Sequence, residues 1–453
     1  MARSCHEQPE ELLSMNILRL AWHSSRHFLG RGAGYYRDTG NFPRTLLYMV
    51  KYAHSMNHRR KAQRRALAAH RMAARSAAGV LPGISARPRL AIKISGGIGD
   101  YIVIARFVRD LVEEELFDFD IYCANESGAD WVFSSIPGFR DTFSEFLFEG
   151  LAPSYSLALS VSQFAAVYHV QRGTLDGHQR LKKVVYNLSR SCLEIEAIVE
   201  HHPHLDGFLG QKAVFTNFNR ANFLHGMAGI AYRGPELGLS CNLSVFEQLG
   251  LGSQAYVTIN NGFDPGFIVT RAQATKCYPH CEELVRRFKK IFPGVRVVQI
   301  GTATSTAIES ADVDLIGRTT LQQAAGLLSG AQLHIDNEGG LVHIARSLGV
   351  RSCVIFGPTS LDYFAYPDNI NIRPTFCGGC WWVNSTWMDV CPRGFETARC
   401  MSTQKPEDIV AAIGAAGFAR AIDGTWRPDR AGAPPAPVHA RELESMHPTA
   451  RPV

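Results

Sequence analysis

The 453-residue sequence lacks any uninterrupted apolar run of about 18 residues, the length that crosses a membrane as a helix. Its first residues, MARSCHEQPEELLSMN, lack the apolar core of a secretory signal, so we expect a cytoplasmic protein. Eleven cysteines, an odd number, disfavour a full disulfide framework and fit a reducing compartment. With 46% hydrophobic and 19% charged residues, the composition excludes a fibrous or globally disordered chain.

Acidic residues are missing from one long stretch. Between Thr39 and Gly99 there is no Asp or Glu but twelve Lys or Arg, although the whole chain carries a net charge of only +6. The densest part, HRRKAQRRALAAHRMAARSAA, is rich in alanine, which predicts a helix. Residues 51–76 fit either peripheral contact with anionic lipid at the inner membrane face or a solvated helix packed on a neighbour, including another subunit. Nucleic acid is disfavoured, because no recognition motif accompanies the charge.

Short apolar runs alternate with helical patterns from residue 89 onward. Helices of about 10–15 residues between such runs predict parallel sheets that are covered on both faces. The fold class we expect is α/β, with two Rossmann-like doubly wound domains that face a cleft. The expected strands are 89–95, 119–125, 255–260, 295–301, 331–336 and 351–357, and the clearest helices are 277–292, 319–330, 340–349 and 406–417.

Four regions follow from this pattern. Residues 1–87 form a basic, largely helical extension, residues 88–250 a first Rossmann-like domain and residues 251–423 a second. Residues 424–453 hold many Pro, Ala and Arg and little apolar bulk, which predicts a disordered tail. The segment 156–170 fits either a strand or a helix.

The loop after the first predicted strand carries the glycines of an anion site. Gly97 and Gly99 allow backbone amides to approach an anion at a helix N-terminus. A dinucleotide fingerprint requires a third glycine where this chain has Ile102, which disfavours an NAD-dependent enzyme. Asp100 follows the glycines directly and fits either a helix cap or a carboxylate base beside a cleft.

Ligands of open parallel sheets bind at the carboxyl ends of the strands, so the other loops at these ends are candidates as well. Lys276 precedes a predicted helix, where an ammonium can meet a phosphate, although a surface lysine is equally compatible. A carboxylate beside glycines suits sugar hydroxyls, whereas His343 fits a ligand contact or a satisfied helix histidine. The candidate donor-binding residues are Lys276, Asn260, Asn261, Gly262, Gly301, Thr302, Glu338, Gly339, Gly340, His343 and Thr359.

Five segments in this order resemble the heptosyltransferase-like glycosyltransferases of family nine. They are Gly97-Ile98-Gly99-Asp100, Thr275-Lys276-Cys277-Tyr278-Pro279, Asp312-Val313-Asp314-Leu315-Ile316-Gly317-Arg318-Thr319, Asn337-Glu338-Gly339-Gly340-Leu341-Val342-His343-Ile344-Ala345 and Phe356-Gly357-Pro358-Thr359. The resemblance runs from about residue 89 to residue 420, with a loose middle, and nothing in it matches the first 85 residues.

The resemblance implies a GT-B fold and a role for several of these residues. Asp100 stands where the family has its proposed base, Lys276 where it binds donor phosphate, and Thr359 near the phosphates. Glu338 stands where an acid, more often aspartate, contacts the donor sugar, so the longer side chain leaves the sugar identity open. Tyr278 stands where the family usually has tryptophan.

Four cysteines near the end of the second domain form a separate pattern. Cys377-Gly-Gly-Cys380, Cys391 and Cys400 lie within 24 residues and are compatible with a tetrahedral iron or zinc site. The alternative is four reduced cysteines, because a second CxxC of a zinc ribbon is missing. The resemblance extends to an autotransporter-modifying subgroup of the family that has an iron-holding finger.

These observations together predict an inverting glycosyltransferase of bacterial cell-surface biosynthesis that needs no catalytic cofactor. The resemblance implies a nucleotide-sugar donor, with ADP-heptose as the first candidate, and a glycan or protein acceptor. The protein is also compatible with assembly into an oligomer. Two alternatives stay open at this point. One is an NAD-dependent sugar oxidoreductase, and the other is a non-enzymatic assembly protein on the same fold.

Overall fold

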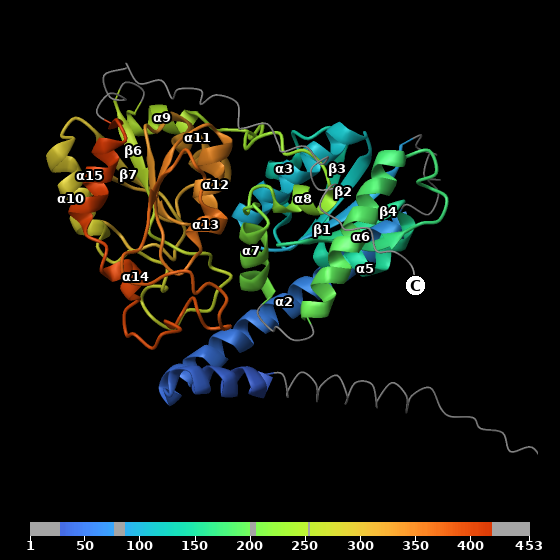
Figure 1. Ribbon diagram of the computed structural model, residues 1–453, viewed down its shortest axis with the longest axis horizontal. Helices are drawn as coiled ribbons and strands as arrows, with labels where there is room; N and C mark the ends of the chain where they lie inside the picture. Colours follow the sequence, from blue (N-terminus) through green and yellow to red (C-terminus); the bar gives the residue numbers. More distant parts are fainter. Residues whose placement is uncertain (1–27, 77–86, 200–204, 252–253, 419–453) are drawn as a thin grey trace, which may run out of the picture.

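The computed structural model describes residues 28–76, 87–199, 205–251 and 254–418. Two sheets lie side by side, each with helices packed around it, and a pair of N-terminal helices runs along one side of both (Figure 1). The predicted disordered tail, residues 424–453, lies outside the described residues.

The first sheet has five strands in the order β3-β2-β1-β4-β5. All neighbours are parallel except β5, which pairs antiparallel with β4. The strands are β1 (Arg89–Ile94), β2 (Asp118–Cys123), β3 (Phe139–Ser144), β4 (Leu157–Val161) and β5 (Ala165–Val170). The helices are α3 (Ile98–Glu114), α4 (Glu126–Phe133), η1 (Glu145–Leu147), α5 (Phe148–Leu151), η2 (Ala152–Ser154), α6 (Gln179–Val199), α7 (Leu205–Phe215) and α8 (Phe223–Ala228).

The second sheet has six strands in the order β11-β10-β9-β6-β7-β8, and every pair is parallel. The strands are β6 (Tyr256–Ile259), β7 (Arg296–Gln299), β8 (Val313–Asp314), β9 (His334–Asn337), β10 (Ser352–Ile355) and β11 (Ile370–Ile372). The helices are α9 (Ser244–Leu249), α10 (Cys281–Ile291), α11 (Leu321–Gly330), α12 (Gly340–Ser347), α13 (Leu361–Phe364), α14 (Arg399–Ser402) and α15 (Pro406–Ala415). Helices α10 and α15 cover one face, and α11 and α12 cover the other (Figure 1).

The prediction of two doubly wound α/β units is confirmed, and each predicted strand is present. The ambiguous segment 156–170 forms a hairpin of two strands, β4 and β5, rather than one element. Helix α10 begins at Cys281, later than the predicted start at residue 277, so Lys276 lies in the turns before the helix.

Helix α3 is apolar over most of its surface because it packs against both units. Its residues join one continuous cluster of buried side chains that also includes Ile344 and Ala345 of α12. Helices α3 and α12 make the most extensive contact between the two sheet units. The glycine loop at the start of α3 is therefore held against the second unit.

The N-terminal extension is helical in residues 28–39 and in α2 (Phe42–Ser76), as the alanine-rich composition predicts. Tyr35 donates a 2.5 Å hydrogen bond to Asp389, and Lys51 donates one of 2.6 Å to the carbonyl of Val269. Arg59 forms a 2.9 Å ion pair with Glu145 of the first unit. The extension therefore bridges both units. Among the described helices, none has the length and hydropathy of a membrane span.

Candidate active site

Two helices begin face to face where the units meet. A methyl group placed on Gly99 would lie 3.2 Å from the Cα of Gly340 and 2.8 Å from Cδ2 of His343. Both positions therefore require glycine, because a larger side chain would separate α3 from α12. The partial positive charges of two helix N-termini then converge on one region, which favours a bound anion.

Asp100 lies in the first turn of α3, and its carboxylate is held on both oxygens. Oδ2 accepts a 3.0 Å hydrogen bond from the backbone amide of Gly97, which confirms the capping interaction. Oδ1 accepts bonds from Nη2 of Arg220 at 2.8 Å and from Nε2 of Gln163 at 3.2 Å. The side chain keeps 26% of its surface exposed, so an acceptor hydroxyl can still reach it. Capping and base chemistry are therefore compatible in this residue.

Arg220 and Gln163 orient this carboxylate from two other segments. Oε1 of Gln163 accepts a 3.1 Å hydrogen bond from the hydroxyl of Tyr363. The backbone amide of Arg220 donates a 2.8 Å bond to the carbonyl of Tyr363, a residue of α13 in the second unit. The surroundings of Asp100 thus come from both units.

A buried charged cluster lies on the other side of the Gly99–Gly340 contact. Nζ of Lys276 lies 3.5 Å from Oε2 of Glu338, and Nε2 of His343 lies 3.7 Å from Oε1 of the same carboxylate. Burial by itself raises the pKa of Glu338, but the Lys276 ammonium and His343 hold it below its ordinary value. Lys276 is therefore not a surface lysine but a buried cation beside the start of α12.

His343 is linked to a phenol that the sequence analysis did not identify. Its Nδ1 lies 2.6 Å from the hydroxyl of Tyr366. Burial would lower the pKa of His343, but Tyr366 and the Glu338 carboxylate raise it above its ordinary value. Burial also opposes ionisation of Tyr366, yet Arg106 and His343 lower the pKa of this phenol to about 8.

Asp336, within β9, and Glu338, just after it, have different partners. Asp336 is buried, accepts a 2.8 Å hydrogen bond from Asn260 and lies 3.2 Å from Nε2 of His334. Burial raises the pKa of Asp336. Asp336 therefore ties β9 to the end of β6, whereas Glu338 is the carboxylate placed beside the donor candidates.

The predicted loops after β6 and β7 are joined to each other by hydrogen bonds. Oδ1 of Asn260 accepts bonds from the amide of Gly262 and from Ser305, and Asn261 is bonded to the backbone of Thr306 on both sides of its amide group. Gly301 has a positive φ of 150° and lies against Asn260 and Ser305, so a side chain there would clash.

The remaining predicted residues differ in accessibility. Thr302 is exposed and bonded to Thr304. Thr359 is buried in the loop after β10. Asn261, whose carbonyl and amide ends are both bonded within the protein, therefore fits a structural role better than a direct ligand contact.

The cysteine segment packs onto the loop that carries Thr359. The amide of Gly379 donates a 3.1 Å bond to the carbonyl of Gly357, and the amide of Trp381 donates one of 2.8 Å to Pro358. Asp389 of the same segment receives bonds from Tyr35 and Thr270. The segment is thus fixed between the N-terminal helices and the candidate donor site.

The four thiols of Cys377, Cys380, Cys391 and Cys400 lie close enough to influence one another. Burial, followed by the other three thiols, raises the pKa of Cys400 to about 12, and burial and the neighbouring thiols raise that of Cys380 to about 11. Within the described part of the chain, however, no group of three or more His, Cys, Asp or Glu side chains has the arrangement that holds a metal ion.

Several residues of the site had no sequence motif. Arg220 and Gln163 lie in the loose middle of the chain, where no periodicity marked them. Arg106 could have been noticed as a charged residue on the helix face of Ile102. That face is otherwise mostly buried and apolar. Ile102 itself is part of the core, which removes the structural basis for a dinucleotide fingerprint at this turn.

Part of the chain is similar to a known protein family. Residues 271–375 match the family described as glycosyltransferase family 9 (heptosyltransferase). Among solved structures, an ADP-heptose LPS heptosyltransferase II of E. coli is 14% identical, with 73% of this chain and 99% of that chain covered and a TM-score of 0.45. The iron-containing dodecameric glycosyltransferase TibC of enterotoxigenic E. coli H10407 is 16% identical over 74% and 77%, with a TM-score of 0.47.

A family 9 glycosyltransferase of Veillonella parvula is 13% identical over 73% of this chain and 97% of its own, with a TM-score of 0.43. No curated protein matches the sequence. The family match covers part of the second unit, so residues 271–375 are similar to family 9 glycosyltransferases, and the described chain has two Rossmann-like units. The resemblance to the heptosyltransferase-like family 9 is confirmed over residues 271–375.

Proposed function

We propose that this protein moves a sugar of the heptose type from a nucleotide diphosphate donor to a hydroxyl of a glycan or protein, with inversion at the anomeric carbon. One observation carries the proposal. Helix α3, which carries Asp100 in its first turn, contacts through Gly99 the helix that carries His343 beside Lys276 and Glu338. A carboxylate for the acceptor and a cation for the donor phosphates thus meet at one contact between the units.

The residues of each side have distinct tasks in this reaction. Asp100 accepts the proton of the acceptor hydroxyl while its oxygen bonds to the anomeric carbon. The bond from that carbon to the diphosphate oxygen breaks, and negative charge builds up on the departing diphosphate. Lys276 and the backbone amides at the start of α12 stabilise this charge, so the reaction does not require Mg²⁺. Glu338 is placed to accept hydrogen bonds from the sugar.

The direct test is incubation of the purified protein with ADP-heptose and detection of slowly released ADP, since water replaces an unknown acceptor. We expect release from ADP-heptose that added Mg²⁺ does not accelerate, and no reduction of NAD in the presence of sugars. Absence of ADP release, together with absence of ADP binding by calorimetry, would contradict the proposed donor. Release from a GDP-sugar instead would replace ADP-heptose as the donor and keep the transfer reaction.

Metal binding by Cys377, Cys380, Cys391 and Cys400 stays a prediction. The thiols lie near enough to influence one another, and Gly379 adopts a positive φ of 68° in the turn between the first two cysteines. The raised pKa values of Cys380 and Cys400 mean that a metal must displace protons from these thiols, so its affinity should increase with pH. We expect about one iron or zinc per chain after anaerobic purification.

Elemental analysis checks this prediction, with a C377S/C380S double variant that should lose the metal and melt at a lower temperature. A C123S variant is the matched control, because Cys123 is a buried cysteine outside this segment. Less than about a tenth of an equivalent of iron plus zinc, with four titratable thiols in the segment, would show that these cysteines are simply reduced.

We also propose that α2 contacts anionic lipid. On its outer face, Phe42, Leu46 and Val50 are 68%, 58% and 60% exposed at spacings of four residues. The exposed cations Lys61 and Arg64 continue this face toward residue 76. An apolar stripe that continues into cations suits a headgroup layer, where each cation near an anionic surface contributes about 1 kcal/mol.

We expect co-sedimentation with phosphatidylglycerol-containing vesicles but not with phosphatidylcholine alone, and loss of binding in a K61E/R64E variant. An R286E/K290E variant on α10 makes the same change of charge elsewhere and should still bind. If the apolar stripe instead joins two copies of the chain, an L46S/V50S variant should have a lower molecular mass in solution than the unaltered protein. In that case neither protein should bind the vesicles, and the lipid proposal is wrong.

A further inference from the structure

Arg106 lies on α3, six residues after Asp100, and is completely buried between the two units. Its Nη1 donates a 2.5 Å hydrogen bond to the hydroxyl of Tyr366, and its Nη2 donates to the carbonyl of His343 at 3.1 Å and to the hydroxyl of Ser347 at 2.8 Å. Its Nε donates a 2.7 Å bond to the carbonyl of Pro235. One side chain therefore joins the helix of Asp100 to α12, to Tyr366 and to the segment between the units.

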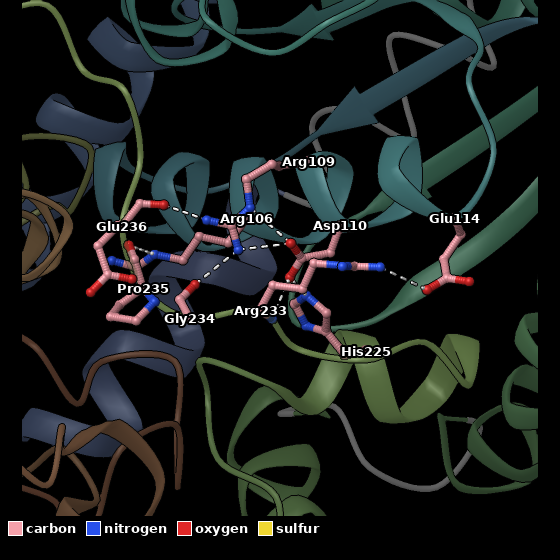
Figure 2. A network of polar contacts seen from close by, with 9 residues as sticks. All are labelled: Arg106, Arg109, Asp110, Glu114, His225, Arg233, Gly234, Pro235 and Glu236. Carbon is pink, nitrogen blue, oxygen red and sulfur yellow. Dashed lines mark hydrogen bonds and ion pairs between the residues drawn. The ribbon is translucent and has the colours of Figure 1, made fainter. Parts of the chain in front are cut away.

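The next turn of α3 binds the same connecting segment, residues 233–236, through separate hydrogen bonds. Figure 2 shows Arg109 and Asp110 pointing from α3 toward residues 233–236, with His225 of α8 below them. Arg109 donates hydrogen bonds to the carbonyls of Gly234, at 2.9 Å, and Glu236. Asp110 accepts from the amide of Arg233 at 3.0 Å and lies 2.9 Å from Nε2 of His225. These contacts secure the connecting segment but do not reach the donor cluster.

The charge of Arg106 distinguishes it from this second set. In the part of the chain that the structure describes, no carboxylate lies within ion-pair distance of its guanidinium, and its partners are carbonyls and hydroxyls. A buried cation without a counterion is costly, so a partner that can take negative charge is favoured. Tyr366 is that partner, and it contacts His343 in turn.

From Arg106 to Lys276, basic and acidic side chains alternate. The guanidinium of Arg106 faces the phenol of Tyr366, the phenol faces the imidazole of His343, and the imidazole faces the carboxylate of Glu338. That carboxylate faces the ammonium of Lys276. Each of these side chains favours the charged form of its neighbour, so removal of the charge at one end changes the ionisation of the others.

We propose that Arg106 is a positioning residue of the glycosyl transfer, which holds His343 and Glu338 in place against the donor and fixes the helix of Asp100 to them. This inference rests on the proposed function. It assigns to Arg106 no contact with the substrate, because its hydrogen bonds go to the protein. The connection matters because a displacement of about 1 Å between reacting groups can cost about 100-fold in rate.

The ionisation of Tyr366 reports on this connection independently of activity. The titratable or charged groups that face it are Arg106 from α3, His343 from α12 and Tyr232 from the connecting segment. Removal of the Arg106 cation leaves a phenolate less stable, so the pKa of Tyr366 must rise above its value of about 8. The other tyrosines with shifted pKa values, such as Tyr256 and Tyr278, are shifted upward, so the step of Tyr366 is separate from theirs.

The experiment compares R106Q, which loses the positive charge, with R106K, which keeps the charge but loses the several N–H donors of the guanidinium group. R109K is the matched control, because Arg109 lies on the same helix and binds the same segment but not the donor cluster. Tyrosine ionisation is followed by near-ultraviolet absorbance, with Y366F to identify the step near pH 8. Thermal melting confirms that each variant is folded.

We expect the step near pH 8 to be present in the unaltered protein and R109K, absent in Y366F and shifted to higher pH in R106Q. The rate of ADP release from ADP-heptose should fall about 100-fold in R106Q and less in R106K. In R106Q, the pH at which the rate declines on the alkaline side should increase together with the pKa of Tyr366. ADP affinity should change much less than the rate. R109K should retain the pH profile of the unaltered protein.

Two failures can be told apart. If the unaltered protein releases ADP but R106Q shows the same tyrosine titration, pH profile and rate as R109K, Arg106 is structural only and the inference is wrong. If the unaltered protein neither binds ADP nor hydrolyses ADP-heptose, the proposed function is wrong, whereas the titration still tests the Arg106–Tyr366 pair. A melting temperature lowered equally in R106Q and R109K, with equal rates, also counts against a positioning role.

Discussion

Replacing Asp100 by Asn should lower the release of ADP from ADP-heptose about 100-fold or more, because water then loses its general base. Asn is isosteric, and its side-chain oxygen can still cap α3 through the amide of Gly97, so the fold should persist. The affinity for ADP should change little, since Asp100 faces the acceptor rather than the diphosphate. Initial rates and calorimetry with ADP measure the two effects separately.

The control for Asp100 is E247Q, which removes an exposed carboxylate from the first turn of α9, the helix that precedes β6 and so lies at the amino end of that strand. Its rate should equal that of the unaltered protein. The variant D100N also removes the negative charge from the 2.8 Å contact with Arg220, so a lower thermal stability is expected as well. A D100N variant that keeps more than about a tenth of the rate would exclude Asp100 as the base.

Replacing Lys276 by Met should weaken ADP binding and lower the rate together, by about 100- to 1,000-fold in the rate. The ammonium is expected to pair with the diphosphate both before and during its departure, so ground state and transition state lose the same partner. Methionine keeps much of the side-chain volume, which limits the effect to the charge. Calorimetry with ADP and initial rates with ADP-heptose test both parts.

The same variant has a pH-dependent stability that follows from Glu338. In the unaltered protein Lys276 holds the pKa of Glu338 below its ordinary value, and the resulting stability is present above that ordinary pKa and lost as the pH falls through the lowered one. K276M removes this contribution, so it should be destabilised more at neutral pH than near pH 4, where the carboxylate is protonated when unfolded. Thermal melts at both pH values measure the difference.

A K276M/E338Q double variant separates stability from binding. Loss of both charges leaves no unpaired buried carboxylate, so the melting temperature at neutral pH should recover relative to K276M. ADP binding should remain weak, because the phosphate partner is still absent. Unchanged ADP affinity in K276M would remove Lys276 from the donor site, whatever its effect on stability.

The local elements could be predicted because each depends on residues that are close in sequence. The buried strand 89–94, the glycine turn and the amphipathic pattern of α10 are properties of short segments. The hairpin of β4 and β5 was not distinguished from a helix, because SLALSVSQFAAVYHV has an apolar run that fits both periods. The late start of α10 likewise reflects turns before Cys281 that periodicity does not mark.

The cysteine segment shows the limit of spacing as an argument. Four cysteines within 24 residues are compatible with a metal site in sequence terms. The structure brings their thiols near enough to influence one another, but no metal-holding group of three or more is found among the described residues. Contacts with Gly357, Pro358 and Thr270 hold the backbone of the segment in place. Only the elemental analysis decides between the reduced and the metal-bound form.

Short-range patterns in the sequence predicted two parallel sheets, the loops at the ends of their strands, and the side chains at those loops, including Asp100, Lys276 and Glu338. The partners of these side chains depend on contacts between distant parts of the chain. Arg220 reaches Asp100 across 120 residues, and Arg106 reaches Tyr366 across 260. Strand and helix patterns arise from neighbours along the chain, whereas these pairs exist because α3 packs between the two units, and that packing depends on both sheets at once.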